Sequence, residues 1–131
     1  MTVAVAHQIS ATSRKALVEA VREANYRGTD LAVLHVVESI DADSKEAYRL
    51  GVSDEIEKVV GEGPPVSWKL HLETARGDLG DALLKLVESV DADLLVIGAR
   101  RRSPVGKALL GSVAQTVILE ANLPVLVVKA P

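Results

Sequence analysis

The sequence contains no cysteine among its 131 residues, and this absence excludes two classes of structure. A chain without thiols cannot form disulfides, and it cannot hold a metal ion through thiolate ligands. The absence also fits a reducing compartment, where structural disulfides are rare. We therefore expect a cytoplasmic protein whose fold depends on its hydrophobic core.

Aromatic residues are almost as scarce, at 2% of the chain, and phenylalanine is absent. The core must therefore be built from Val, Leu, Ile and Ala, within an apolar content of 48%. Such a core is typical of a parallel sheet that helices cover on both faces. The chain length favours one domain over residues 1–131.

Long apolar runs are missing as well. No run approaches the roughly 18 residues that suggest a membrane-spanning helix, and the start, MTVAVAHQIS, lacks the pattern of a signal peptide. The net charge of −3 opposes general binding to nucleic acids or anionic membranes. We therefore expect neither a membrane nor a nucleic acid as a partner.

The apolar residues alternate between strand-like runs and helix-like periods along the whole chain. Ser13 is expected to cap the first helix and Gly28 to end it, whereas Gly77-Asp78 opens the third helix. This strict alternation predicts an α/β fold with a parallel sheet and right-handed crossovers. The predicted strands are residues 2–7, 31–37, 66–74, 93–98 and 125–129, and the helices lie in residues 13–28, 41–60, 79–90 and 112–121.

The segment GARRRSPVGKALLGSV, residues 98–113, connects the fourth strand to the fourth helix. It is longer than the usual connection of about 2–6 residues, and it leaves the strand end at which open α/β sheets bind ligands. Gly111 allows a ligand to approach the backbone. Ser112 is expected to cap the helix, whose N-terminus attracts anions. An anionic ligand is therefore expected here.

These residues also carry a resemblance. Gly98, Gly111 and Ser112 have the spacing of the nucleotide motif of the universal stress proteins of the UspA family, and DADLLVIG, LHVV and the tail GSVAQTVILEANLPVLVVK resemble that family too. The resemblance covers essentially the whole chain. It implies an open five-stranded parallel sheet in the order 3-2-1-4-5 with helices on both faces, the adenine nucleotide alpha hydrolase-like fold.

The resemblance further implies a site for ATP or a related adenine nucleotide, with Mg²⁺ as a companion ion, between residues 6–13 and 98–112. Backbone amides and the Ser112 hydroxyl would hold the phosphates, and Arg101 and Lys107 would add positive charge. Val36 and Val37 would flank the base, and Gln8 would form a hydrogen bond with the adenine edge. No catalytic or metal-binding residue is expected, so hydrolysis would be slow at most. The candidate binding residues are Gln8, Val36, Val37, Gly98, Arg100, Arg101, Lys107, Gly111, Ser112 and Val113.

Two positions depart from the family's motif. Arg101 stands where the motif has its second glycine, and Gln8 or His7 stands where ATP-binding members have an aspartate. Arg101 either pairs with phosphates or fills the space that they would occupy. The sequence therefore leaves two functions open, namely nucleotide binding with little or no hydrolysis and a dimeric interaction module that binds no nucleotide. A weaker third alternative is an enzyme acting on small phosphorylated metabolites.

The fifth strand is apolar and lies at an edge of the implied sheet. An exposed apolar edge is a template for pairing with another chain. Only Lys129 and Pro131 are residues of the kind that opposes such pairing here. We therefore expect a homodimer, two-fold symmetric and antiparallel, through residues 123–129. The family resemblance implies the same interface.

Three other patterns are interpreted as structural. Gly106-Lys107 is not a P-loop, because a glycine five residues earlier and a following Ser or Thr are both missing. The Arg100–Arg102 cluster lacks the interleaved aromatics of a nucleic-acid site. His7, His35 and His71 fall on predicted neighbouring strands, and we interpret them as unrelated side chains rather than as metal ligands. His7 alone is a candidate ligand contact.

Overall fold

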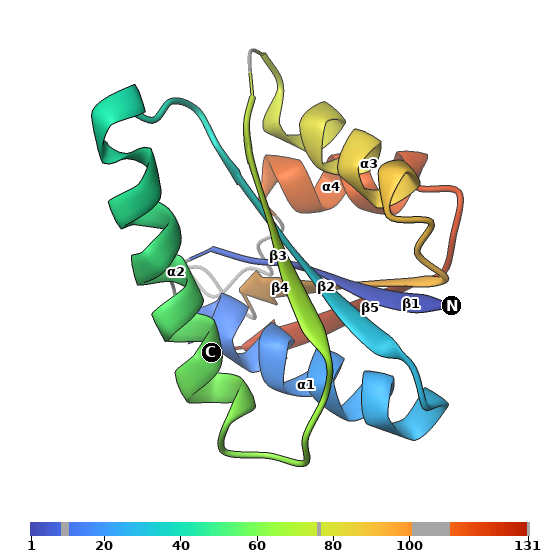
Figure 1. Ribbon diagram of the computed structural model, residues 1–131. Helices are drawn as coiled ribbons and strands as arrows, with labels where there is room; N and C mark the ends of the chain where they lie inside the picture. Colours follow the sequence, from blue (N-terminus) through green and yellow to red (C-terminus); the bar gives the residue numbers. More distant parts are fainter. Residues whose placement is uncertain (9–10, 76, 101–110, 131) are drawn as a thin grey trace.

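The computed structural model describes residues 1–8, 11–75, 77–100 and 111–130, which form one parallel sheet between two layers of helices (Figure 1). The strand order is β3-β2-β1-β4-β5, as predicted. The strands are β1 (Thr2–Ala6), β2 (Asp30–Val37), β3 (Trp68–Thr74), β4 (Leu94–Arg100) and β5 (Val125–Ala130). The helices are α1 (Ala11–Arg27), the short η1 (Ala42–Ser44), α2 (Lys45–Val60), α3 (Leu79–Ser89) and α4 (Ser112–Glu120).

Two apolar cores lie on the two faces of the sheet. Successive strand residues point to opposite faces, so Val3 and Val5 pack with α1 and α2, whereas Ala4 between them packs with α3 and α4. The central strands are buried on both faces, which is typical of parallel sheets. Figure 1 shows α1 and α2 apart from the α3–α4 pair, with the strands between them.

The order in which strands are added to the sheet reverses at β1. Val5 lies opposite Val33 of β2 on one side and opposite Val96 of β4 on the other. The crossover from β1 leads to β2, whereas the later crossover from β3 returns to β4 beyond β1. This reversal creates a switch point at the carboxyl ends of β1 and β4, the place where open α/β sheets leave a crevice.

The ends of α1 confirm one predicted boundary and correct another. Gly28 ends the helix as predicted, with a φ of +64° that suits glycine. Its N–H donates to Asn25 O, and Thr29 N–H donates to Ala24 O, which is a Schellman arrangement. The predicted cap at Ser13 is wrong, because the helix begins two residues earlier, at Ala11.

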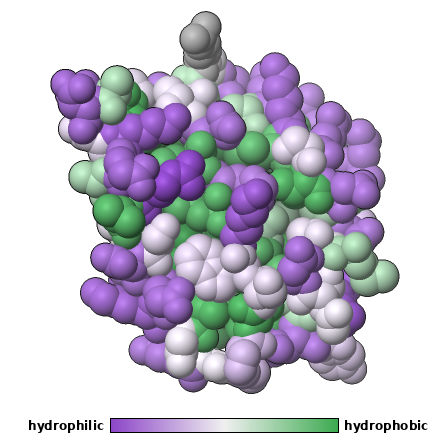
Figure 2. All heavy atoms as spheres, viewed as in Figure 1, coloured by the Kyte–Doolittle hydropathy of each residue, from purple (hydrophilic) through white to green (hydrophobic). Residues whose placement is uncertain are grey.

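The two edge strands match the sequence interpretation. β3 alternates between buried and exposed residues and pairs with β2 alone. In the face shown in Figure 2, apolar side chains are visible around this strand, framed by hydrophilic ones. β5 forms the opposite edge and pairs with β4, with Leu95 opposite Val125. None of the helices in the described ranges is both long and apolar enough to cross a membrane.

Candidate functional site

A cavity of about 240 Å³ lies beside the carboxyl ends of the strands. Glu38 follows β2, Gly77 and Asp78 follow β3, and Ser112 begins α4, so segments far apart in sequence meet there. Its lining residues are Glu38, Gly77, Asp78, Leu79, Ser112 and Val113. Two of the predicted binding residues, Ser112 and Val113, therefore face one cavity.

The start of α4 supplies amide donors to this cavity. The N-cap is Gly111, in extended backbone and without a side-chain hydrogen bond, so the prediction that Ser112 caps the helix is wrong. Ser112 is instead the first helical residue, and the first intrahelical bond recorded is Gln115 N–H to Gly111 O, at 3.0 Å. The N–H groups before Gln115 have no acceptor within the helix. They carry the positive end of the helix dipole, which favours an anion.

The start of α3 faces the same cavity. Asp78 caps this helix, as predicted from Gly77-Asp78, and its Oδ1 accepts a hydrogen bond from Asp81 N–H at 3.1 Å. Gly80 lies against α4, because a Cβ there would come within 2.9 Å of Thr116. The missing side chain lets the two helices approach closely. Both helix N-termini consequently open onto one small volume.

Gly98 has a packing role that the motif did not reveal. A Cβ at this position would lie 2.7 Å from Thr12 Cγ2 and 2.8 Å from Thr12 O. The first turn of α1 therefore packs directly on the β4 backbone. The close contact places the start of α1 directly against β4 near the switch point.

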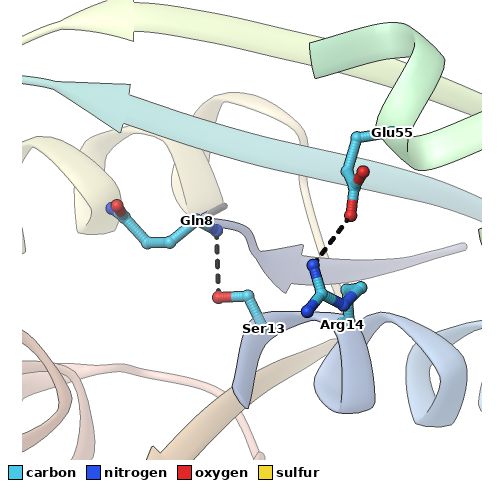
Figure 3. Close-up of polar contacts among 4 residues, drawn as sticks. All are labelled: Gln8, Ser13, Arg14 and Glu55. Carbon is cyan, nitrogen blue, oxygen red and sulfur yellow. Dashed lines mark hydrogen bonds and ion pairs between the residues drawn. The ribbon is translucent and has the colours of Figure 1, made fainter. Parts of the chain in front are cut away.

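Gln8 lies where β1 leads into α1. Its backbone N–H donates to Ser13 Oγ at 3.0 Å, and its exposed side chain extends away from Ser13 (Figure 3). Ser13, although not the cap, thus fixes the backbone at Gln8. On the neighbouring helix turn, Arg14 pairs with Glu55 of α2 at 3.2 Å (Figure 3).

The remaining predicted site residues fall into three groups. Val36 is buried in the core beneath α3 and α4, and Val37 is partly buried at the end of β2. Arg101 and Lys107 lie outside the described residues, as do Gly106 and Arg102 of the rejected P-loop and nucleic-acid patterns. The structure describes the strand position of Arg100 but not the placement of its side chain.

A buried hydrogen-bond chain behind the switch point corrects the interpretation of the histidines as unrelated. His7 Nδ1 and His35 Nδ1 lie 2.9 Å apart, and His35 Nε2 lies 2.9 Å from the Tyr48 hydroxyl of α2. We call His7, His35 and Tyr48 the histidine relay. Both imidazoles are 1% exposed. Tyr48 also packs against the core and thereby connects α2 to the sheet.

Electrostatics keep the two imidazoles neutral. Burial is the main cause that lowers the pKa of His7 to about 4, the nearby His35 lowers it further, and Glu55 opposes the shift. Burial also lowers the pKa of His35. His7 Nε2 is buried without a hydrogen-bond partner among the described residues. Those residues include no cluster of three or more His, Asp or Glu side chains suited to a metal ion.

The relay could have been found from the sequence by register. Val5 pairs with Val33, so His7 and His35, each two residues further along, must share one face of adjacent strands. The signal was a shared spacing, because 28 residues separate His7 from His35 and Val5 from Val33. His71 lies on β3, opposite Leu34 rather than His35.

Comparisons with known proteins agree with the fold. The sequence model of the universal stress protein family matches residues 1–129. A universal stress protein from Mycolicibacterium smegmatis is 37% identical over 131 residues, covering 97% of this chain and 96% of that protein. A solved universal stress protein from Archaeoglobus fulgidus has a TM-score of 0.82 and 30% identity, with 98% of each chain covered. A structure of the universal stress protein from that organism in complex with dAMP has a TM-score of 0.73, again with 30% identity and 98% coverage of both chains.

Proposed function

Since the chain belongs to the universal stress protein family, we propose that it binds an adenine nucleotide at the cavity beside the carboxyl ends of the strands. The observation that carries this proposal is the meeting of two helix N-termini, those of α3 and α4, on one cavity. Paired amide donors and helix dipoles favour a phosphate. The dAMP complex of the Archaeoglobus fulgidus protein supports the same ligand class.

The arrangement of charges suggests how the nucleotide lies. Glu38 and Asp78 line one side of the cavity, and a phosphate would be repelled by these carboxylates. The phosphate therefore lies at the amides of Ser112 and Val113, and the ribose hydroxyls donate to Glu38. Gln8 offers both an amide donor and an acceptor, the pair that matches an adenine edge.

ATP with Mg²⁺ is the specific ligand that we propose, and binding rather than turnover is the proposed activity. The triphosphate would extend from the start of α4 toward the segment that contains Arg101 and Lys107, whose charges suit phosphates. Of the carboxylates that line the cavity, Asp78 is already engaged as a helix cap, and Glu38 would accept from the ribose hydroxyls. The proposed pose therefore leaves neither of these two carboxylates to activate water as a general base.

Titration calorimetry tests the proposal with purified protein and AMP, adenosine, IMP and ATP, the last with and without Mg²⁺. AMP is expected to bind more tightly than adenosine, which lacks the phosphate, and than IMP, which lacks the amino group that Gln8 would accept from. At a hundred times its Kd, AMP should stabilise the fold by about 2.7 kcal/mol. Absence of heat with both AMP and ATP would reject nucleotide binding and favour the interaction module.

We also propose that the chain forms a homodimer through β5. This strand is an edge, and Val125 and Val127 are only partly buried. The α4 residues just before it expose Ile118 to 40% and Leu119 to 82%. Pairing two copies of β5 would complete the sheet edge and cover apolar surface.

Light scattering at micromolar concentration is expected to give the mass of a dimer. Val127→Lys places like charges near the two-fold axis and should give a monomer, whereas Thr74→Lys on the opposite edge strand should leave the dimer intact. Circular dichroism checks that both variants fold. A wild-type chain that scatters as a monomer would contradict the proposal.

A further inference from the structure

The histidine relay connects three elements that are distant in sequence. His7 follows β1 and is fixed by its own N–H, which donates to Leu34 O at 2.8 Å. His35 lies within β2, and Tyr48 lies in the first half of α2. The relay is therefore a polar connection from the centre of the sheet to a helix at its side.

Two neutral imidazoles satisfy both relay contacts, whereas two protonated imidazoles cannot. Each contact needs one proton between two heavy atoms, and two neutral rings with one phenol supply three protons. A first added proton would place a charge in a buried position. A second would put an N–H on both Nδ1 atoms, which lie 2.9 Å apart, so that neither could accept. The relay is consequently incompatible with full protonation.

The charged groups around the relay do not offset this conflict. Glu55 of α2 is the carboxylate that acts on His7, and it is already paired with Arg14 of α1. Among the described residues, no other charged group shifts the pKa of either imidazole. His7 Nε2 is buried without an acceptor for the proton it would gain.

The first half of α2 has few other attachments to the protein. The buried residues of this helix are Val52, Ile56 and Val60, and none of them precedes its eighth residue. Residues 45–51 include no buried side chain, and Leu50 is 57% exposed. Within that stretch, Tyr48 packs against the core and bonds to His35. The preceding η1 turn has no buried residue either.

We propose that the histidine relay is a proton-sensitive latch, which holds residues 45–51 at the start of α2 on the sheet at neutral pH and releases them in acid. In the released form the histidines have ordinary pKa values near 6.5. In the closed form the pKa of His7 is lowered to about 4. The released form therefore binds protons preferentially below about pH 6.5, and the equilibrium shifts toward release as the pH falls from there toward 4.

Amide hydrogen exchange at pH 7.5 and pH 5.0, corrected for intrinsic exchange rates, tests the latch. Between pH 7.5 and pH 5.0, protection of amides 49–53 is expected to fall roughly 30-fold for each histidine that takes up a proton on release. This factor follows from a pKa near 6.5 in the released form. Protection in β4 should change much less, because the sheet stays closed. The ring ¹⁵N shifts of His7 and His35 should show neutral imidazoles in the folded protein at pH 5.5.

Variants separate the latch from general acid instability. His7→Leu should reduce the pH dependence at residues 49–53, and Tyr48→Phe should lower their protection at both pH values while keeping both imidazoles. His71→Gln, which changes the histidine outside the relay, should behave as wild type. An equal loss of protection in α2 and β4, or an imidazole pair that titrates near pH 6.5 in the folded protein, would overturn the proposal. The wild-type exchange and shift measurements decide the matter even if His7→Leu fails to fold.

Discussion

Gly98→Ala is expected to destabilise the protein by about 2–3 kcal/mol, as overpacking of a rigid contact does. The added Cβ would lie 2.8 Å from the backbone oxygen of Thr12 and 2.7 Å from its Cγ2. A side chain can rotate away, but the backbone oxygen belongs to the first turn of α1 and cannot move without shifting the helix. Denaturant unfolding of the variant and the wild type measures the difference.

Gly51→Ala is the matched control for this substitution. Gly51 lies within α2, and a Cβ there would meet no atom within 4 Å. The same chemical change should therefore stabilise the protein by about 0.5–1 kcal/mol, since alanine favours a helix interior over glycine. Thr12→Ser, which removes Cγ2, should recover part of the loss in Gly98→Ala. Equal stability of Gly98→Ala and the wild type would show that α1 does not pack on β4 as described.

Ser112→Glu is expected to weaken AMP binding more than about 30-fold, the effect of placing a like charge near the phosphate at an intermediate effective dielectric. Ser112 is the first residue of α4 and lines the cavity. The fold itself should gain about 0.3–1 kcal/mol, because a carboxylate is favourable at a helix N-terminus. Binding and stability are thus predicted to change in opposite directions, which calorimetry and unfolding measure separately.

Ser112→Gln provides the neutral control at the same position. It adds nearly the same volume as glutamate without the charge, so it should bind AMP more tightly than Ser112→Glu does. Wild-type affinity in both variants would mean that the phosphate lies away from the start of α4. A large loss in both would indicate that space, rather than charge, limits the site.

The sequence predicted the order of strands and helices because the apolar pattern repeats a simple rule in each segment. Short apolar runs became buried strands, and runs with a 3.6-residue period became helices. Gly28 could be assigned because glycine is favoured at a positive φ after a helix. The strand order itself came from the resemblance to the universal stress proteins, and the structure agrees with it.

The helix starts were predicted less well, because a serine near a helix start can serve more than one role. Ser13 accepts a hydrogen bond from Gln8 N–H inside the first turn, and Ser112 begins a helix that Gly111 caps. Sequence spacing does not distinguish these roles within one or two residues. Asp78 was assigned correctly because it follows a glycine and directly precedes a strongly periodic run.

Contacts between distant segments were beyond the sequence patterns. Gly98 and Gly80 fitted a motif and a helix period, but their contacts with Thr12 and Thr116 require knowledge of which elements cross. The bond between His7 and His35 depends on strand register. The candidate site was therefore predicted as the segment 98–113 with Gln8, Val36 and Val37, whereas its described lining also includes Glu38 and Asp78.

A map of backbone amide shifts during titration with AMP tests nucleotide binding at the paired helix starts most directly. We predict that the amide chemical shifts of Ser112, Val113 and Leu79 change most, and that they saturate at one AMP per chain. The amide chemical shifts around Asp91, at the other end of the sheet, should not change. Unchanged amides at the starts of α3 and α4 at saturating AMP would contradict the account.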